Sequence, residues 1–479
     1  MSTQIRLFVI AITLLALVAG VFTMVSAQEE QVTLKLMNYS GEQTDFYVEV
    51  ADAFNEEFPN ITLEVEIIAQ AEYVEAMPLL FQQDEAPDIF FWLSSSNRVL
   101  TAAELRDLGW IAPIQGANTE EFMSRWPEGS FVEGINLFDG EVWAFPFNDN
   151  KIWGAGYMYF NRDIFEAAGL DPDSPPTTWS ELESACAAIV ETGVSCLAFP
   201  MTGNQFQRPW FAIAGSIMTD QFFDLQTGTY AIDDPRMIEA FEYIQGLNNA
   251  GFLVPGVEDQ TFMRQAFGNE IAAIYFDGPW IPSVLEGMGF TDLNYDVARA
   301  PAPDGGRSGV LAQTHSENKY FVSSQTEHPE EAAMFIEWMT RPDGWFAQHY
   351  LEQSFGTLAY ADNGEYLGNP VFAELATEIG GDFRVLYPEP AIACPAVAQS
   401  EAFRNADQIR PNWEFEEMVE ALVNGEDFAP IAGDIAAAKD AAFQETIEAE
   451  VEAGLDISLD CFTFPEFDYT SDYFTVAMQ

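Results

Sequence analysis

Basic residues are scarce in this chain of 479 residues. Lysine and arginine together number 18, against 77 aspartates and glutamates, which leaves a formal net charge of −59. A protein of that sign repels phosphate backbones and anionic lipid headgroups, so we expect neither nucleic-acid nor membrane-surface binding. The acids are spread along the whole chain. They therefore indicate a strongly hydrated surface, suited to high salt, or a field that attracts a cationic ligand.

Histidines are few, and the motifs of several enzyme classes are missing. None of the three histidines lies three or four residues from another histidine or from a cysteine, so the usual spacing of zinc ligands is absent. The G-x-S-x-G and G-x-x-x-x-G-K motifs are also absent. The paired carboxylates of a glycosidase cannot be judged in this way, because 77 acids form many pairs by chance. We predict no catalytic activity, no metal and no cofactor, with a secreted carbohydrate-active enzyme as the alternative.

Only four cysteines occur, namely Cys186, Cys196, Cys394 and Cys461. They allow three pairings. Residues 177–193 predict a helix that begins with a capping box formed by Thr178 and Glu181, and a strand-like SCLAF segment returns beneath its apolar face. This geometry predicts a Cys186–Cys196 disulfide, and Cys394–Cys461 then follows by elimination. Free buried thiols are the alternative.

Long apolar runs are missing except at the N-terminus. In residues 1–27, Arg6 is the only charged side chain, and Val25-Ser26-Ala27 precedes an acidic flank. These features predict a cleaved secretory signal, with an uncleaved anchor as the alternative. No lipobox cysteine follows the signal. We therefore expect export through the inner membrane and a soluble periplasmic or extracellular product.

Apolar residues are plentiful, at 48% of the chain, and the length suits two or three domains. Strand-like segments at 32–39, 61–68 and 86–92 alternate with helical patterns. This alternation predicts an α/β fold with a mostly parallel sheet covered by helices on both faces. Ligands of such sheets bind beyond the carboxyl ends of the strands, where Ser94 and Ser95 follow the third segment.

Six stretches, taken in order, resemble the carbohydrate-binding family of solute-binding proteins of ATP-binding-cassette importers, which includes maltose-binding protein. They are FNEEFPNITLEVE (54–66), APDIFFW (86–92), GEVWAFPF (140–147), MYFNRDIFEAAGLDPDSPPTTWSEL (158–182), RQAFGNEIAAIYFDGPW (264–280) and SSQTEHPEEAAMFIEWMT (323–340). The resemblance implies a two-lobed periplasmic-binding-protein-like fold, each lobe a mostly parallel sheet flanked by helices, joined by a hinge. Mapped onto this chain, lobe one is 28–149 and 309–352, and lobe two is 150–308 and 353–479.

The resemblance also implies a function. A ligand would bind in the cleft between the lobes, hinge closure would bury it, and the closed protein would deliver it to a membrane permease. The expected ligand is a neutral sugar or oligosaccharide, and we expect the protein to be monomeric. A polyamine or another cationic solute bound by the same fold is the alternative.

Trp280 is the first candidate for the ligand site. It follows an apolar run that ends in Asp277-Gly278-Pro279, where glycine and proline stop a strand and turn the chain. A tryptophan in a large protein is more often core than ligand platform. The resemblance nevertheless places this residue at the cleft, where a flat indole can stack on a sugar ring.

The other candidates are aromatic residues near the ends of predicted elements and polar residues beside strand ends. They are Trp413, Trp92, Trp210, Glu42, Ser94, Ser95, Asn148, Asp149, Gln205 and Gln207. Amides, hydroxyls and a few acids suit sugar hydroxyls, which both donate and accept hydrogen bonds. Only Arg98 and Arg208 bring positive charge nearby, which disfavours a phosphorylated sugar.

The dispersed acids also make a prediction about salt. If the acidic surface is an adaptation to high salt, molar salt should raise the Tm of the purified protein, because screening at 1 M shortens the range of charge repulsion to about 3 Å. Thermal unfolding followed by circular dichroism over a salt series measures this. A Tm that stays flat or falls between low and molar salt would contradict the high-salt interpretation.

Overall fold

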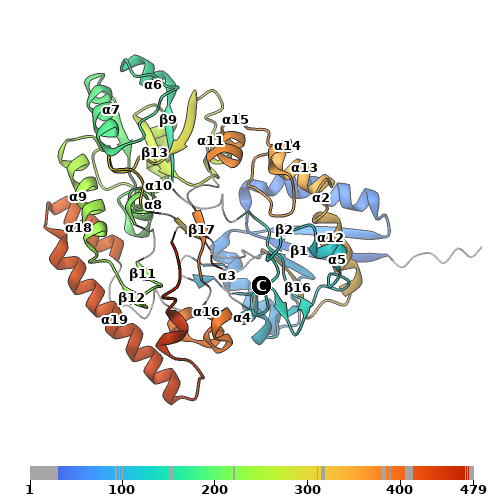
Figure 1. Cartoon of the computed structure of the whole chain (residues 1–479). Coiled ribbons are helices and arrows are strands. Elements are labelled where there is room, and N and C mark those ends of the chain that lie inside the picture. Colours follow the sequence, from blue (N-terminus) through green and yellow to red (C-terminus); the bar gives the residue numbers. More distant parts are fainter. Residues whose placement is uncertain are drawn as a thin grey trace, which may run out of the picture.

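The computed structural model contains two α/β lobes that lie side by side (Figure 1). The residues that it describes are 31–91, 94–95, 98–99, 101–149, 156–218, 222–309, 311–313, 319–379, 384–388, 390–404, 414–469, 471 and 473. The predicted signal, residues 1–27, lies outside the described residues. Within the described part, no helix combines the length and the apolar character that a membrane span needs.

Lobe one is built on a sheet with the strand order β2-β1-β3-β16-β6. Its strands are β1 (Val32–Asn38), β2 (Ile61–Ile67), β3 (Ile89–Phe91), β6 (Ile111–Ala112) and β16 (Tyr320–Ser323). Its helices are α2 (Thr44–Glu57), α3 (Gln70–Gln82), α4 (Ala102–Asp107), α5 (Glu120–Met123), α12 (Pro329–Met339) and α13 (Trp345–Glu352). Side chains alternate along β1, so Leu34 and Leu36 pack with α2 and α12, while Met37 packs with α3 and α4. Both faces of the sheet are therefore covered.

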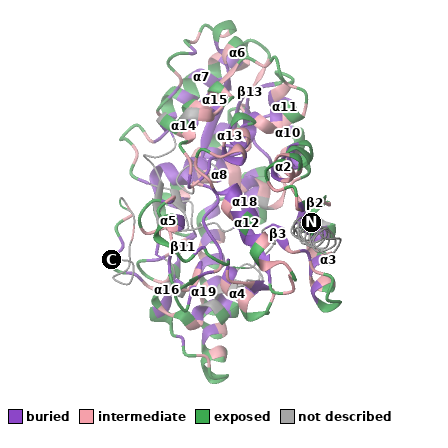
Figure 2. Ribbon diagram, turned by 90° about the vertical axis from the view of Figure 1, so that its right-hand side faces the viewer, coloured by how far each residue is buried: buried purple, intermediate pink, exposed green. Residues whose placement is uncertain are grey.

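Lobe two contains a second sheet with the order β10-β13-β9-β14. Its strands are β9 (Tyr157–Asn161), β10 (Ser195–Ala198), β13 (Ala272–Asp277) and β14 (Tyr295–Arg299). Its main helices are α6 (Arg162–Ala167), α7 (Trp179–Glu191), α8 (Gln207–Ile217), α9 (Pro235–Asn249), α10 (Gln260–Gly268), α11 (Ile281–Gly287), α18 (Glu414–Asn424) and α19 (Phe428–Glu452). Every residue of β13 is buried. In Figure 2, buried residues fill the interior and exposed residues lie mainly on the outer helices and loops.

Each sheet is mostly parallel, as predicted, and contains one reversed strand that the sequence did not indicate. β16 pairs antiparallel with β3 and β6, and β9 pairs antiparallel with β13 and β14. Both strands are entered when the chain crosses over from the other lobe, so no helical crossover obliges them to run parallel to their neighbours. Their amino ends consequently lie beside the carboxyl ends of adjacent strands, with Tyr320 opposite Phe91 and Tyr157 opposite Asp277.

Several local predictions are confirmed. Thr178 and Glu181 form a capping box at the start of α7, and Gly193 follows that helix with a φ of 92° that favours glycine. Ala332, Phe335, Ile336 and Met339 are all buried on α12. These features were predictable because they depend on residues three or four positions apart.

The chain crosses between the lobes three times. The lobe-one core includes Leu358 and Tyr360, and the lobe-two core resumes at Phe372, so the last crossing runs through α14 (Asn363–Tyr366) into α15 (Pro370–Glu374). The second crossing contains β15 (Leu311–Gln313), which pairs with β17 (Arg384–Leu386). β17 lies between the two lobes in Figure 1.

The segment after α19 packs against lobe two. Phe464 N donates to Leu225 O at 2.6 Å, and the Tyr469 hydroxyl donates to Asp224 Oδ1 at 2.7 Å. Asp224 is the last residue of β11 (Phe223–Asp224), and Leu225 begins the turn that leads to β12 (Thr229–Tyr230). Both predicted disulfides are present, Cys186–Cys196 and Cys394–Cys461. The second ties this C-terminal segment to the loop between α16 (Pro390–Ala393) and the 3-10 helix η5 (Pro395–Gln399).

The two disulfides should contribute unequally to stability. They span sequence separations of 10 and 67 residues. In the chain-entropy model, removing the short and the long loop should lower the free energy of unfolding by about 3 and about 4 kcal/mol respectively. Denaturant unfolding of Cys186→Ala/Cys196→Ala and Cys394→Ala/Cys461→Ala measures both values. A larger loss from the short loop would contradict the model.

Candidate functional site

A buried carboxylate ends the central strand of lobe two. Asp277 is fully buried at the carboxyl end of β13. Its Oδ1 accepts a hydrogen bond from Gly278 N at 2.8 Å. Its Oδ2 accepts from the Tyr275 hydroxyl at 2.7 Å, from Gln260 Nε2 at 3.1 Å and from Arg264 at 3.0 Å. Because an ionised carboxylate is costly to bury without such partners, this network holds Asp277 in one position.

Two arginines from different helices converge on Asp277. Arg264 comes from α10, and Arg208, in the first turn of α8, places Nε 3.5 Å from Asp277 Oδ1. Burial, the largest single effect, lowers the pKa of Arg264, but the charge of Asp277, the nearby Tyr275 and the hydrogen bonds to both together exceed it, so the net shift of the pKa is upward. Burial, and then the charge of Asp277, raise the pKa of Tyr275 well above its usual value. Arg264 is therefore a cation and Tyr275 a neutral hydrogen-bond donor at physiological pH.

Trp280 is positioned by the turn that follows Asp277. A Cβ added to Gly278 would overlap the Cη2, Cζ2 and Cζ3 atoms of Trp280, so the indole ring packs directly against the glycine backbone. The Tyr159 hydroxyl donates to Gly278 O at 2.7 Å and fixes the turn from the neighbouring strand. Trp280 itself is only partly buried at the start of α11, and the Arg208 guanidinium lies 5.0 Å from its ring centroid. The result is a partly exposed indole on a rigid support.

Lobe one also carries aromatic and amide groups at its strand ends. Asn38, the last residue of β1, accepts hydrogen bonds at Oδ1 from Tyr39 N and Ser40 N, at 2.6 and 3.0 Å. Its Nδ2 is buried without a hydrogen-bond partner among the described residues. The Tyr39 ring centroid lies 5.1 Å from that of Tyr73 and 5.3 Å from that of Phe91. The sequence analysis did not select Asn38, although a polar residue at the end of an apolar strand can indicate a binding position.

Asn148 and Asp149 lie where two crossing segments pair. Asn148 is buried and donates from Nδ2 to Thr357 O at 2.8 Å, while Asp149 N donates to the same oxygen at 3.4 Å. Asn148 Oδ1 and Thr357 Oγ1 are buried without hydrogen-bond partners among the described residues. The two predicted residues thus belong to the connection between the lobes, and their part in ligand binding stays a prediction.

The remaining predicted residues have varied positions. Trp210 is fully buried in the lobe-two core, stacked on Phe222 with ring centroids 5.8 Å apart. Gln205 is partly buried and accepts at Oε1 from Gln260 N at 2.7 Å, and Gln207 begins α8. Trp92 and Trp413 lie outside the described residues. For Glu42, Ser94 and Ser95 the structure describes the backbone alone.

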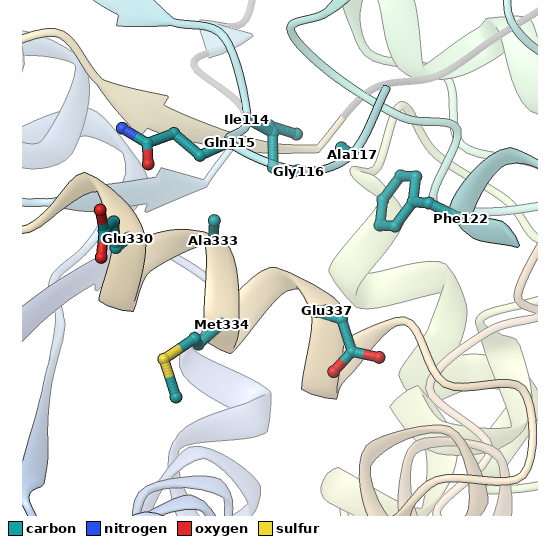
Figure 3. A pocket seen from close by; sticks show the side chains of 9 residues that line it. All are labelled: Ile114, Gln115, Gly116, Ala117, Phe122, Glu330, Ala333, Met334 and Glu337. Carbon is teal, nitrogen blue, oxygen red and sulfur yellow. The ribbon is translucent and has the colours of Figure 1, made fainter. Parts of the chain in front are cut away.

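A pocket of about 360 Å³ lies elsewhere, on lobe one. Figure 3 shows Ala333 and Glu337 of α12 opposite the loop 114–117 and Phe122. Glu337 is held by Arg125 and Arg341, both at 2.9 Å. None of the predicted site residues lines this pocket. The described residues also contain no group of three or more His, Cys, Asp or Glu side chains arranged to hold a metal.

Comparison with known proteins identifies the family. A family model described as bacterial extracellular solute-binding protein matches residues 40–344, which is more than half of the chain. The chain belongs to this family. It is a solute-binding protein and not an enzyme, and its two-lobed fold agrees with that assignment.

Three similar proteins illustrate the relationship. A binding protein of Brucella abortus is 23% identical over 335 residues, covering 69% of this chain and 76% of the relative. The sn-glycerol-3-phosphate-binding periplasmic protein of the same species is 24% identical over 233 residues, covering 47% and 51%. The GacH receptor of Streptomyces glaucescens, which has been solved without ligand and with acarbose, has a TM-score of 0.63 and 17% identity, over 88% of this chain and 99% of the receptor.

Removing the charge of Asp277 should destabilise lobe two of the solute-binding protein. Asp277→Asn preserves the shape of the side chain but leaves two guanidinium groups without their shared anion. We expect a loss of roughly 3 kcal/mol or more in the free energy of unfolding, as when one partner of a buried ion pair is removed. Denaturant unfolding measures this.

The matched control is Glu242→Gln, which removes one negative charge from an exposed position on α9. It should change stability little, because exposed charges are solvated in both the folded and the unfolded state. An equal loss in the two variants would show that Asp277 does not organise the turn.

Proposed function

We propose that this solute-binding protein captures a sugar or oligosaccharide between its lobes and delivers it to the permease of an ATP-binding-cassette importer. The observation that carries the proposal is Trp280, a partly exposed indole on a fixed turn at the carboxyl end of β13. This is the edge of an α/β sheet at which ligands generally bind.

An indole suits one face of a sugar. A pyranose ring has an apolar C–H face and a belt of hydroxyl groups around its edge. Trp280 can cover the apolar face, while the amide of Gln207 and the hydroxyl of Tyr39 can bind the belt. A site that combines an apolar wall with a few polar groups is the usual form of small-molecule sites.

The comparisons support a sugar over the alternatives. The GacH receptor, whose fold this chain shares, was solved with acarbose. One relative is named for binding sn-glycerol-3-phosphate, so small polyols should be included among the ligands tested. A polyamine or another cationic solute is disfavoured, because the guanidinium group of Arg208 lies over Trp280 and would repel a cation.

Delivery requires the lobes to open and close. We propose a hinge at the crossing segments, where Ala359 N donates to Phe147 O at 2.9 Å and Asn148 pairs with Thr357. We further propose that residues 1–27 direct export and that the protein acts outside the cytoplasm. A thermal-shift screen over a broad panel of sugars and polyols tests the function, because a ligand that binds the folded state raises Tm by mass action.

Trp280→Ala should weaken binding of the sugar found in that screen. Losing a buried stacking surface at a hot spot costs about 2 kcal/mol or more, which is at least about a tenfold loss of affinity. Isothermal titration calorimetry measures the affinity, and denaturant unfolding of the ligand-free protein measures the stability.

Trp210→Ala is the matched control, because Trp210 is fully buried in the same lobe. It should lower the free energy of unfolding by roughly 3–5 kcal/mol, while the folded fraction retains its affinity. If Trp280→Ala behaved in this second way, Trp280 would be a core residue and not a platform.

A further inference from the structure

The turn at Trp280 carries an excess of positive charge. Two guanidinium groups, those of Arg208 and Arg264, share the single carboxylate of Asp277. Arginine stays protonated at any physiological pH, so these three side chains sum to one positive charge. In a chain with a net charge of −59, such a local excess needs a structural or a functional reason.

The carboxylate is already saturated by other donors. Gly278 N, the Tyr275 hydroxyl, Gln260 Nε2 and Arg264 all donate to it, at distances between 2.7 and 3.1 Å. Arg208 contributes only an ion-pair contact of 3.5 Å from Nε, and that atom is buried without a hydrogen-bond partner. The network around Asp277 would therefore remain largely satisfied without Arg208.

Arg208 has donors to offer a ligand. Its guanidinium carries five N–H groups, and no hydrogen bond from any of them to a described residue is present. The side chain retains 23% of its exposure and lies over the Trp280 ring, at 5.0 Å from the centroid. A planar guanidinium whose donors are not used by the described residues fits the two oxygens of a carboxylate or phosphate group better than it fits single hydroxyl groups.

We propose that the ligand is an acidic sugar, whose carboxylate or phosphate group binds Arg208 beside a ring stacked on Trp280. This inference rests on the proposed function, since it concerns the same site, and it replaces the neutral sugar expected from the sequence. That expectation counted only the cations close in sequence to the candidate residues. Arg264 lies outside them, yet it meets Arg208 at Asp277 and leaves the guanidinium of Arg208 available.

The overall negative charge does not prevent such binding. Repulsion between an anionic ligand and the distant surface acids is screened over about 8 Å at physiological ionic strength and over about 3 Å at 1 M salt. The contact with Arg208 acts at hydrogen-bond range and is screened much less. The preference for an acidic ligand should therefore persist, and become clearer, as salt is added.

Matched pairs of ligands test the proposal. Isothermal titration calorimetry with the full mature protein, at 0.15 M and about 1 M salt, would compare a trigalacturonate with a neutral galactotriose, and glucose 6-phosphate with glucose. Inorganic phosphate alone serves as the control for an anion without a ring. We expect the acidic member of at least one pair to bind roughly tenfold or more tightly than its neutral partner, as a charge-assisted hydrogen bond predicts.

Variants assign that preference to Arg208. Arg208→Gln should reduce the acidic-over-neutral ratio to about one, whatever its effect on the absolute affinities, whereas Arg208→Lys should retain part of the ratio. Arg236→Gln removes the same charge from an arginine of lobe two that pairs with Asp234 on the surface, and it should leave the ratio intact. Tm is recorded for each variant, and because the ratio is taken within one protein sample, partial unfolding does not affect it.

The outcomes separate the two proposals. A neutral sugar that binds as tightly as its acidic partner, or a ratio that survives Arg208→Gln, would overturn the acidic-ligand inference and leave the sugar-binding function standing. If no sugar of either charge bound, the proposed function would fall and the inference with it.

Discussion

The geometry of the candidate site depends on one carboxylate that has been removed from water. Burying the charge of Asp277 is unfavourable unless donors and cations surround it; the donors come from the backbone, β13 and α10, and α8 adds the ion-pair contact of Arg208. The segments that supply them must therefore meet at the end of β13. Gly278 and Trp280 follow Asp277 in the chain, so the hydrogen bonds that hold Asp277 also help to position the indole.

The path of the chain between the lobes determines which strand ends meet at the site. β9 and β16 each begin where the chain arrives from the opposite lobe, and each runs against its neighbours. Reversal places the first residues of these strands beside the last residues of β13 and β3. Tyr159 of β9 can thus hold Gly278 in lobe two, while Tyr320 packs beside Phe91 in lobe one. The same crossings that connect the lobes also contribute the aromatic residues of their inner edges.

The sequence predicted features that depend on nearby residues, and it predicted contacts between distant segments less well. The capping box of α7, the Cys186–Cys196 disulfide and the buried strand before Trp280 all follow from short-range patterns, and the family followed from six motifs in order. The strand reversal was missed, because alternating strands and helices do not reveal which connection crosses between lobes. Trp210 and Trp280 both follow polar or turn-forming residues, yet Trp210 points from α8 into the core of lobe two, whereas Trp280 lies at the start of a helix beside a glycine. The convergence of Arg208 and Arg264 on Asp277 could not be predicted, since the three lie on separate elements.

Direct packing of the indole on the Gly278 backbone has a consequence for how this protein could diversify. The backbone of Gly278 forms one support of the ring, and the adjoining hydrophobic core of lobe two forms another. Arg208 belongs to neither support, so its exchange should displace the aromatic surface little. Under the proposed function, selectivity for a solute and the placement of the stacking ring would be separable traits, and related proteins with this turn could change their ligand while keeping the aromatic surface.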